Sequence, residues 1–100
     1  MQSRNLSSLA AQVTASHAHL HIVNLNDHSV MLAVNEGSFP WHSHPNSDEF
    51  FLVVEGELVV EFEDGPSEIL RPMDTLVVKA GVVHQTHAHG RTVNLLFERD

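Results

Sequence analysis

From residue 16 onward the chain alternates polar and apolar side chains with a period of two, and only an extended strand places such residues on two separate faces. The alternation is clear over residues 17–22 and again over 57–63, where Leu58, Val60 and Phe62 share one face. We expect these three side chains to line the interior of a sheet structure. Glycine and proline interrupt the pattern at nearly even intervals, as they do between short strands. The sequence therefore predicts an all-β fold.

A first strand begins at Ser16 and ends at the turn residues Asn24–Asp27. Eight further strands are expected at residues 28–35, 37–42, 49–55, 57–63, 67–70, 74–79, 83–88 and 91–98. Many short strands favour a closed barrel or a double-sheet jelly roll, because either arrangement limits exposed sheet edges. Residues 50–54 and 76–78 are apolar on both faces, so their outer faces are expected to meet another sheet or a second subunit. A homodimer is the simplest explanation.

Ahead of the strands, Asn5 can cap a short helix over about residues 5–13, in which Leu6, Leu9 and Val13 recur at helical spacing. We expect this helix to lie at the rim of the barrel. A chain of 100 residues fits one core, so residues 1–100 are predicted to form a single domain with its barrel at about 17–98.

The 13 acidic and 5 basic residues give a formal net charge of −8, and the basic residues are scattered. This balance argues against nucleic acid or an anionic membrane as a partner, because both attract clustered Lys and Arg. No apolar run approaches the roughly 20 residues that span a bilayer, and no secretory signal pattern is recognised, so a cytoplasmic protein is expected. Cysteine and tyrosine are absent, which leaves histidines, carboxylates, lysine, hydroxyl groups and a bound metal to supply any chemistry.

Three histidines and one glutamate have the spacing of a single metal site. His42 and His44 share one face of a strand, Glu49 can return on the next strand, and His84 follows 40 residues after His44. Neutral imidazoles and a carboxylate suit Fe, Mn, Ni, Zn, Co or Cu about equally well. We predict that these four residues bind one divalent transition metal, and that two coordination positions stay open for a small molecule.

These residues resemble the two motifs of the cupin superfamily of small metal-binding β-barrels. The first motif contains a glycine, a His-x-His pair, a glutamate and a closing glycine. The corresponding residues here are Gly37, His42, His44, Glu49 and Gly56, with the gap between Gly37 and His42 one residue shorter than the common pattern.

The second cupin motif contains a glycine, a Pro-x-Gly sequence, a histidine and a terminal asparagine. Gly81 and His84 match this motif, whereas Met73 stands at its first glycine, Lys79 at its proline and Ala88 at its asparagine.

The resemblance implies a double-stranded β-helix, or jelly-roll, cupin barrel in which all four metal-binding positions are filled. The wider pattern is similar to small single-domain cupins of mostly unassigned activity, some of which are labelled mannose-6-phosphate isomerase-like. A sugar phosphate fits this chain poorly, because a phosphate dianion usually meets Arg, Lys or a helix N-terminus and the chain has no basic cluster.

Strand parity gives expectations for the neighbours of the predicted ligands. If His84 faces inward, Thr86 and Ala88 also face inward, and Ala88 enlarges the cavity. Trp41 has the opposite parity to His42, so we expect it to pack between sheets or subunits. Lys79 is expected at the rim as a solvated amine. Asp48 is expected to point outward and to be solvated. Five apolar residues are expected to belong to the core: Phe51, Val53, Leu58, Val60 and Phe62.

Six further histidines are expected to be polar surface residues. His17, His19 and His21 share one strand face, which we interpret as a polar outer face in preference to a second metal patch. The remaining three receive the same interpretation: His28, His87 and His89.

Two functions remain open at this stage. The first is a metal-dependent enzyme of oxygenase or isomerase type acting on a small, largely uncharged or enolisable molecule, with Glu49 as both metal ligand and proton acceptor. The second is a non-catalytic module that binds a small ligand or a metal for sensing, because no second catalytic group is evident in the sequence. A purely structural barrel ranks last.

Overall fold

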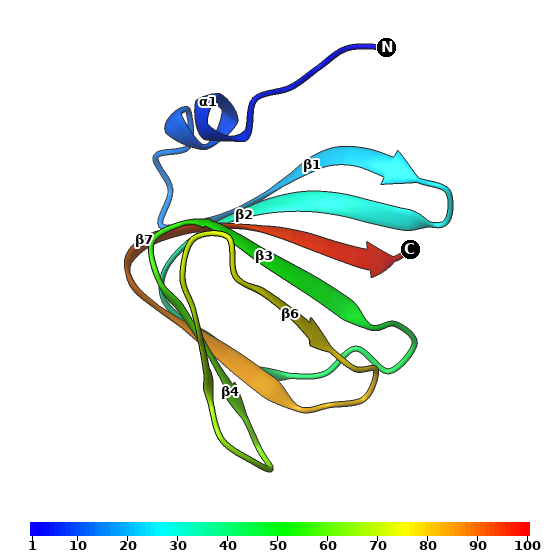
Figure 1. Ribbon diagram of the computed structural model, residues 1–100, viewed down its shortest axis with the longest axis vertical. Coiled ribbons are helices and arrows are strands. Elements are labelled where there is room, and N and C mark those ends of the chain that lie inside the picture. Colours follow the sequence, from blue (N-terminus) through cyan, green and yellow to red (C-terminus); the bar gives the residue numbers. More distant parts are fainter.

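The computed structural model describes residues 1–100, of which 59% lie in strands, so the all-β prediction is confirmed (Figure 1). The elements are α1 (Leu6–Ala11), β1 (His17–Leu25), β2 (His28–His42), β3 (Glu49–Glu55), β4 (Leu58–Phe62), β5 (Glu68–Leu70), β6 (Thr75–Val78) and β7 (His84–Arg99). All strand pairs are antiparallel. No helix of the structure is long and apolar enough to cross a membrane.

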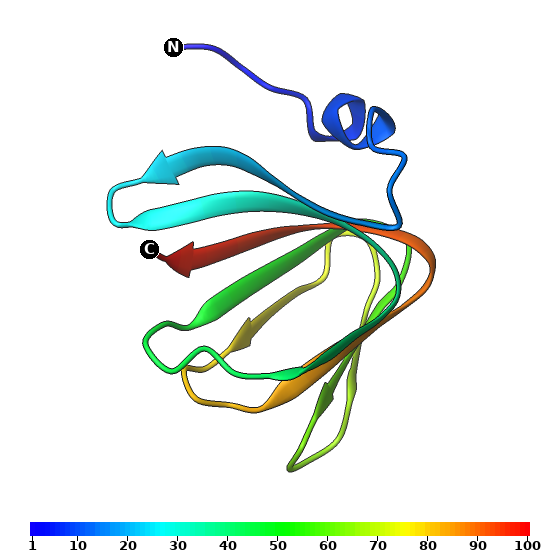
Figure 2. The ribbon, with the colours of Figure 1, turned by 180° about the vertical axis from the view of Figure 1, so that it is seen from behind.

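Two long strands, β2 and β7, bend around one end of the molecule and so belong to two sheets, as the views from front and back in Figure 1 and Figure 2 show. One sheet has the order β1-β2-β7-β3-β6 and contains the first part of β2 and the last part of β7. The other sheet pairs the last part of β2 with the first part of β7, followed by β4 and β5. This double-sheet arrangement is the jelly roll that the sequence predicted.

The structure has seven strands where the sequence suggested nine, because Gly37 and Gly90 bend their strands without ending them. Their φ angles are 81° and 72°, and the β2–β7 ladder changes register between Asn35 and Gly37. A glycine adopts positive φ without a steric penalty, so the ladder can bulge, turn and then resume pairing. The separate strands expected on either side of each glycine are therefore continuous.

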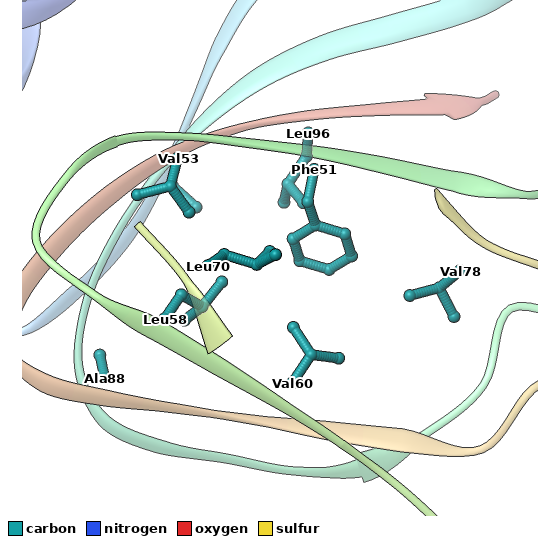
Figure 3. Packing of buried hydrophobic residues seen from close by; sticks show 9 residues of the cluster. Phe51, Val53, Leu58, Val60, Leu70, Val78, Ala88 and Leu96 are labelled. Atoms are coloured by element: carbon teal, nitrogen blue, oxygen red, sulfur yellow. The ribbon is translucent and has the colours of Figure 1, made fainter. Parts of the chain in front are cut away.

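Nine buried apolar side chains fill the space between the two sheets, and Figure 3 shows them converging from opposite walls. They are Ala33, Phe51, Val53, Leu58, Val60, Leu70, Val78, Ala88 and Leu96. Leu58 and Val60 are 1% and 0% exposed, and the half-buried Phe62 packs against the cluster. The predicted inward face of β4 is confirmed.

A second, smaller core lies on the outer side of the larger sheet, beneath α1. Its buried members are Ala10, Leu32, Val34 and Val93. The helix begins as expected, because the Asn5 side chain accepts a hydrogen bond of 2.9 Å from the Ser8 amide. It ends at Ala11, where the guanidinium of Arg91 donates to the Ala10 and Val13 carbonyls. These bonds tie the end of the helix to β7.

The three histidines of β1 are exposed as expected, but they lie on the interior side of the sheet. His19 pairs with Ala33, whose side chain belongs to the barrel core, so His17, His19 and His21 face the same side as Ala33. Leu20 points the other way and packs on the cluster beneath α1. Solvent reaches the histidines because β1 is an edge strand. The prediction of an outer face was wrong, because alternation shows which residues share a face and not which face packs.

The outer face of β3 and β6 is not covered by another sheet of the same chain. Phe50 packs edge-to-face against Phe97 at 5.4 Å between ring centroids, and both remain half-buried. Val77 beside them is 47% exposed, and Trp41 on β2 is 49% exposed. Packing of Trp41 between two sheets of this chain is therefore ruled out, whereas packing between subunits stays a prediction.

Candidate metal centre

The four predicted ligands lie where strands begin and end at the mouth of the barrel. His42 is the last residue of β2 and stands opposite His84, the first residue of β7. Glu49 opens β3, and His44 lies in the loop between β2 and β3. This loop is fixed to the turn before β7, because the Gly81 amide donates to the His44 carbonyl at 3.0 Å. Residues far apart in the sequence are thus brought together at one end of the barrel.

One potential ligand atom from each of His42, His44, Glu49 and His84 lies within 4.8 Å of the other three. Glu49 Oε1 is 3.5 Å from His44 Nε2 and 3.3 Å from His84 Nε2. These three atoms are buried and have no hydrogen-bond partner. Buried polar atoms without partners are costly, and a single group bound by all three atoms would remove that cost.

The separations fit a single cation. Ligand atoms about 2.0–2.2 Å from one ion lie roughly 3 Å apart at a right angle and about 4.2 Å apart across it. The two pairs formed by Glu49 Oε1, at 3.3 and 3.5 Å, fall in this range, and the donor set of nitrogen and carboxylate oxygen suits a divalent transition metal. The four residues could therefore hold such an ion.

Two of the imidazoles are held in the tautomer that a metal requires. Nδ1 of His42 lies 2.8 Å from the Pro40 carbonyl, and Nδ1 of His84 lies 2.9 Å from the Val82 carbonyl. A carbonyl oxygen only accepts, so each Nδ1 must donate, which places the lone pair of each ring on Nε2. Nε2 of His84 faces Glu49 Oε1 at 3.3 Å.

The electrostatics of His84 reflect its carboxylate neighbour. Burial lowers the pKa of His84, but the Glu49 carboxylate 3.3 Å from its Nε2 and the Val82 carbonyl at its Nδ1 outweigh burial, so the pKa lies above its ordinary value of 6.5. The His84 side chain is only 1% exposed. The site thus attracts a positive charge, which a proton or a metal ion can supply.

A cavity of about 40 Å³ adjoins two of the four residues, His42 and Glu49. Its floor is apolar and is formed by Phe51, Leu58 and Leu96. The other lining residues are polar side chains, rings at the mouth and two of the predicted ligands, in this order: Asn35 and Thr86, His19 and Phe39, His42 and Glu49. A water molecule needs on the order of 10–15 Å³ of such space, so about three water-sized groups fit. Thr86 lines the cavity as predicted, whereas Ala88 belongs to the buried core cluster.

Sequence reasoning missed the residues at the mouth of this cavity. His19, Asn35 and Phe39 line both the inner cavity and an outer hollow that also contacts His17 and Ala18. Phe39 lies edge-to-face against His42 at 5.1 Å between ring centroids, and its ring stacks near His19 at 6.5 Å. The available signal was the pairing of the first two strands, which places His19 opposite the inward-facing Ala33.

Lys79 and Asp48 lie outside the cavity, as expected. The Lys79 side chain is 73% exposed and lies 3.3 Å from the Asp48 carboxylate. Asp48 also accepts from the Ala80 amide at 2.9 Å, and this bond, with the Lys79 amine, lowers the pKa of its carboxyl group. Asp48 thus holds the ligand loop against the turn before β7.

The fold and the site together define a jelly-roll barrel with three histidines and one glutamate converging at its mouth. The chain belongs to the cupin family, because the model of the cupin domain matches residues 28–97. It is 45% identical over 95 residues to the uncharacterized protein YdbB of Bacillus subtilis (strain 168), a match that covers 95% of this chain and 84% of YdbB.

Two solved structures are similar over nearly their whole length. A cupin-2 domain containing protein from Shewanella frigidimarina NCIMB 400 has 28% sequence identity and a TM-score of 0.91, with 97% of this chain and 94% of that chain covered. A protein from Ralstonia eutropha JMP134, provisionally assigned as a mannose-6-phosphate isomerase, has 25% identity and a TM-score of 0.84, with 100% and 99% covered. The resemblance to cupins inferred from the motifs is confirmed.

Proposed function

We propose that this cupin is a metal-dependent enzyme that acts on a small molecule, with one divalent transition metal bound by His42, His44, Glu49 and His84. The observation that carries the proposal is the convergence of three buried, unpartnered ligand atoms from His44, Glu49 and His84. When bound there, the metal supplies a Lewis acid and open positions for a small donor molecule. Oxygenase or isomerase chemistry is the reaction class that such a site supports.

The chain's own residues define what this site can hold. Glu49 is the one carboxylate that lines the cavity, so it serves as both ligand and proton acceptor for a bound substrate. Phe51, Leu58 and Leu96 exclude water from the floor, and Asn35 and Thr86 offer polar contacts. The limited volume favours a substrate whose reacting part has only a few non-hydrogen atoms.

The cavity does not support a sugar phosphate as the substrate. No lysine or arginine lines it, and α1 lies on the outer side of the larger sheet. A phosphate dianion would therefore meet Glu49 without a compensating cation. We propose a small, largely uncharged or enolisable substrate instead.

The second candidate is a non-catalytic module that binds a small ligand or a metal for sensing. One observation favours it: apart from the proposed metal ligands, the only titratable group lining the cavity is His19 at its mouth. Oxygen consumption or product formation that depends on added Fe(II) supports the enzyme. Ligand binding with no product detectable by mass spectrometry supports the binding module.

The metal site itself is tested by elemental analysis of protein purified without an affinity tag. We expect about one transition metal per chain in the wild type and a clearly lower metal content in His84→Ala, because one of the three nitrogen ligands is removed. His89→Ala is the matched control, since His89 is exposed and lies outside the cavity. Unchanged metal content in His84→Ala would remove His84 from the site.

A further inference from the structure

His44 differs from the other two histidines of the proposed site in what its second ring nitrogen contacts. His42 and His84 direct Nδ1 to backbone carbonyls. Nδ1 of His44 instead lies 3.5 Å from Glu98 Oε2, while its Nε2 faces Glu49 Oε1 at the same distance. The His44 ring is therefore placed between two carboxylates, one at each nitrogen.

The strand register places these two carboxylates directly opposite one another. Glu49 on β3 pairs with Glu98 on β7, and both side chains are on the interior side of the sheet. Like charges directly opposite on neighbouring strands destabilise a sheet. The only cationic or imidazole group within ion-pair distance of Glu98 is His44. Arg99, the next residue, pairs with Asp27 instead.

We infer that Glu98 is a positioning residue of the metal centre, and this inference rests on the proposed metal site. Glu98 Oε2, 3.5 Å from Nδ1 of His44, is placed to accept the Nδ1 proton, which would fix the tautomer with the lone pair on Nε2 and aim that lone pair at the ion. Because Glu98 faces the ring nitrogen opposite the one that binds the ion, it is not itself a ligand. A carboxylate partner makes the imidazole a stronger donor than a carbonyl partner does.

The position of Glu98 allows its effect on metal affinity to be distinguished from an effect on folding. Its side chain is 22% exposed and, with His44, lines a surface hollow outside the barrel core. Removing the carboxylate therefore opens no core cavity, and the variants are expected to fold. A structural residue would not change metal affinity while leaving the fold intact.

The test measures the Co(II) affinity of the full chain by competition with a chromophoric chelator. We expect Glu98→Ala to weaken binding about 10–100-fold, the range for loss of such a partner. Glu98→Gln keeps an acceptor oxygen and loses only the charge, so its affinity should fall between those of the wild type and Glu98→Ala. Glu57→Gln is the control, because Glu57 pairs with Arg71 and lies outside both the cavity and this hollow. Circular dichroism verifies that each variant is folded.

A second readout is the histidine ¹⁵N spectrum of the Zn(II)-loaded protein. The Nδ1–H signal of His44 should shift in Glu98→Gln, while those of His42 and His84 stay in place. Co(II) affinity within twofold of wild type in both Glu98 variants, with an unchanged His44 signal, would overturn the inference and leave the metal site intact. A wild-type chain that binds neither Co(II) nor Zn(II) would instead overturn the proposed site, and the role of Glu98 with it.

Discussion

At the scale of single residues, His84 couples the proposed metal site to pH. Its pKa is raised above 6.5 by Glu49 and the Val82 carbonyl despite burial. In the metal-free protein, protonated His84 therefore stabilises the fold fully below pH 6.5, and this stabilisation is lost as pH rises through the raised pKa. A metal ion competes with that proton, so its affinity changes in the opposite direction.

We therefore predict that, between pH 6 and 8, the urea midpoint of metal-free protein falls relative to that of His84→Ala, while Co(II) affinity of the wild type rises. Both quantities are compared at constant ionic strength. His84→Ala removes the titrating group, so the difference between the two proteins isolates its contribution from those of the other histidines. A wild-type advantage that grows with pH, or a Co(II) affinity that is flat between pH 5 and 8, would contradict this assignment.

The convergence of His42, His44, Glu49 and His84 could be predicted from the sequence because it depends on local spacing and on two recognisable motifs. His42 and His44 needed only strand parity, and His84 needed the second motif. The roles of His19 and Glu98 depend on which strands pair and in what register, which spacing within one strand does not contain. The missing information on strand pairing also explains why the histidines of β1 were predicted on the outer side of the sheet.

At the scale of elements, the turns explain how the fold tolerates departures from the family motif. Met73 stands at a motif glycine, and it adopts a φ of 75°. The turn is maintained by bonds from the Met73 amide to the Val53 carbonyl at 2.7 Å and from the Asp74 amide to the Arg71 carbonyl at 2.8 Å. A left-handed conformation costs a non-glycine residue about 1–2 kcal/mol, so Met73 strains this turn. The motif located this turn but did not reveal its conformation.

Gly56, between β3 and β4, is needed for space as well as for its backbone conformation. A Cβ atom at this position would lie 2.5 Å from the Arg91 carbonyl oxygen. At Gly65, which also has a positive φ, a Cβ atom would meet nothing within 4 Å. We predict that Gly56→Ala lowers the free energy of unfolding by about 3 kcal/mol or more, an unusually large loss for one residue.

Gly65→Ala serves as the control for that experiment, because it changes the left-handed conformation alone. Its expected cost is about 1 kcal/mol. Urea denaturation of both variants, with their midpoints and slopes fitted together, measures the difference. Equal losses at the two glycines would show that backbone conformation dominates and that the close approach to Arg91 relaxes at little cost.

At the scale of the whole molecule, the two bent strands determine both the cores and the site. Because β2 and β7 each contribute to both sheets, their bends close one end of the barrel and leave the opposite end for His42 and His84 (Figure 1). The sequence predicted the jelly roll but not these continuous strands, because glycine usually marks a turn between strands. Here Gly37 and Gly90 allow the strand to continue in a new direction.

The outer face of the larger sheet leads to the prediction of a homodimer. α1 covers only part of this face, and Phe50, Phe97 and the 47% exposed Val77 lie outside the cluster beneath α1. These three apolar side chains are neighbours on adjacent strands and each remains partly exposed, and an apolar surface patch is typical of interaction sites. Light scattering coupled to gel filtration should give twice the chain mass of 11.1 kDa, and Val77→Asp should return the protein to the monomer mass.

Ile69→Asp is the matched control, because Ile69 is 46% exposed on β5 of the other sheet and should leave the dimer intact. A wild-type mass of one chain at about 100 μM, well above ordinary dissociation constants for such contacts, would show that this apolar face is stable in water by itself.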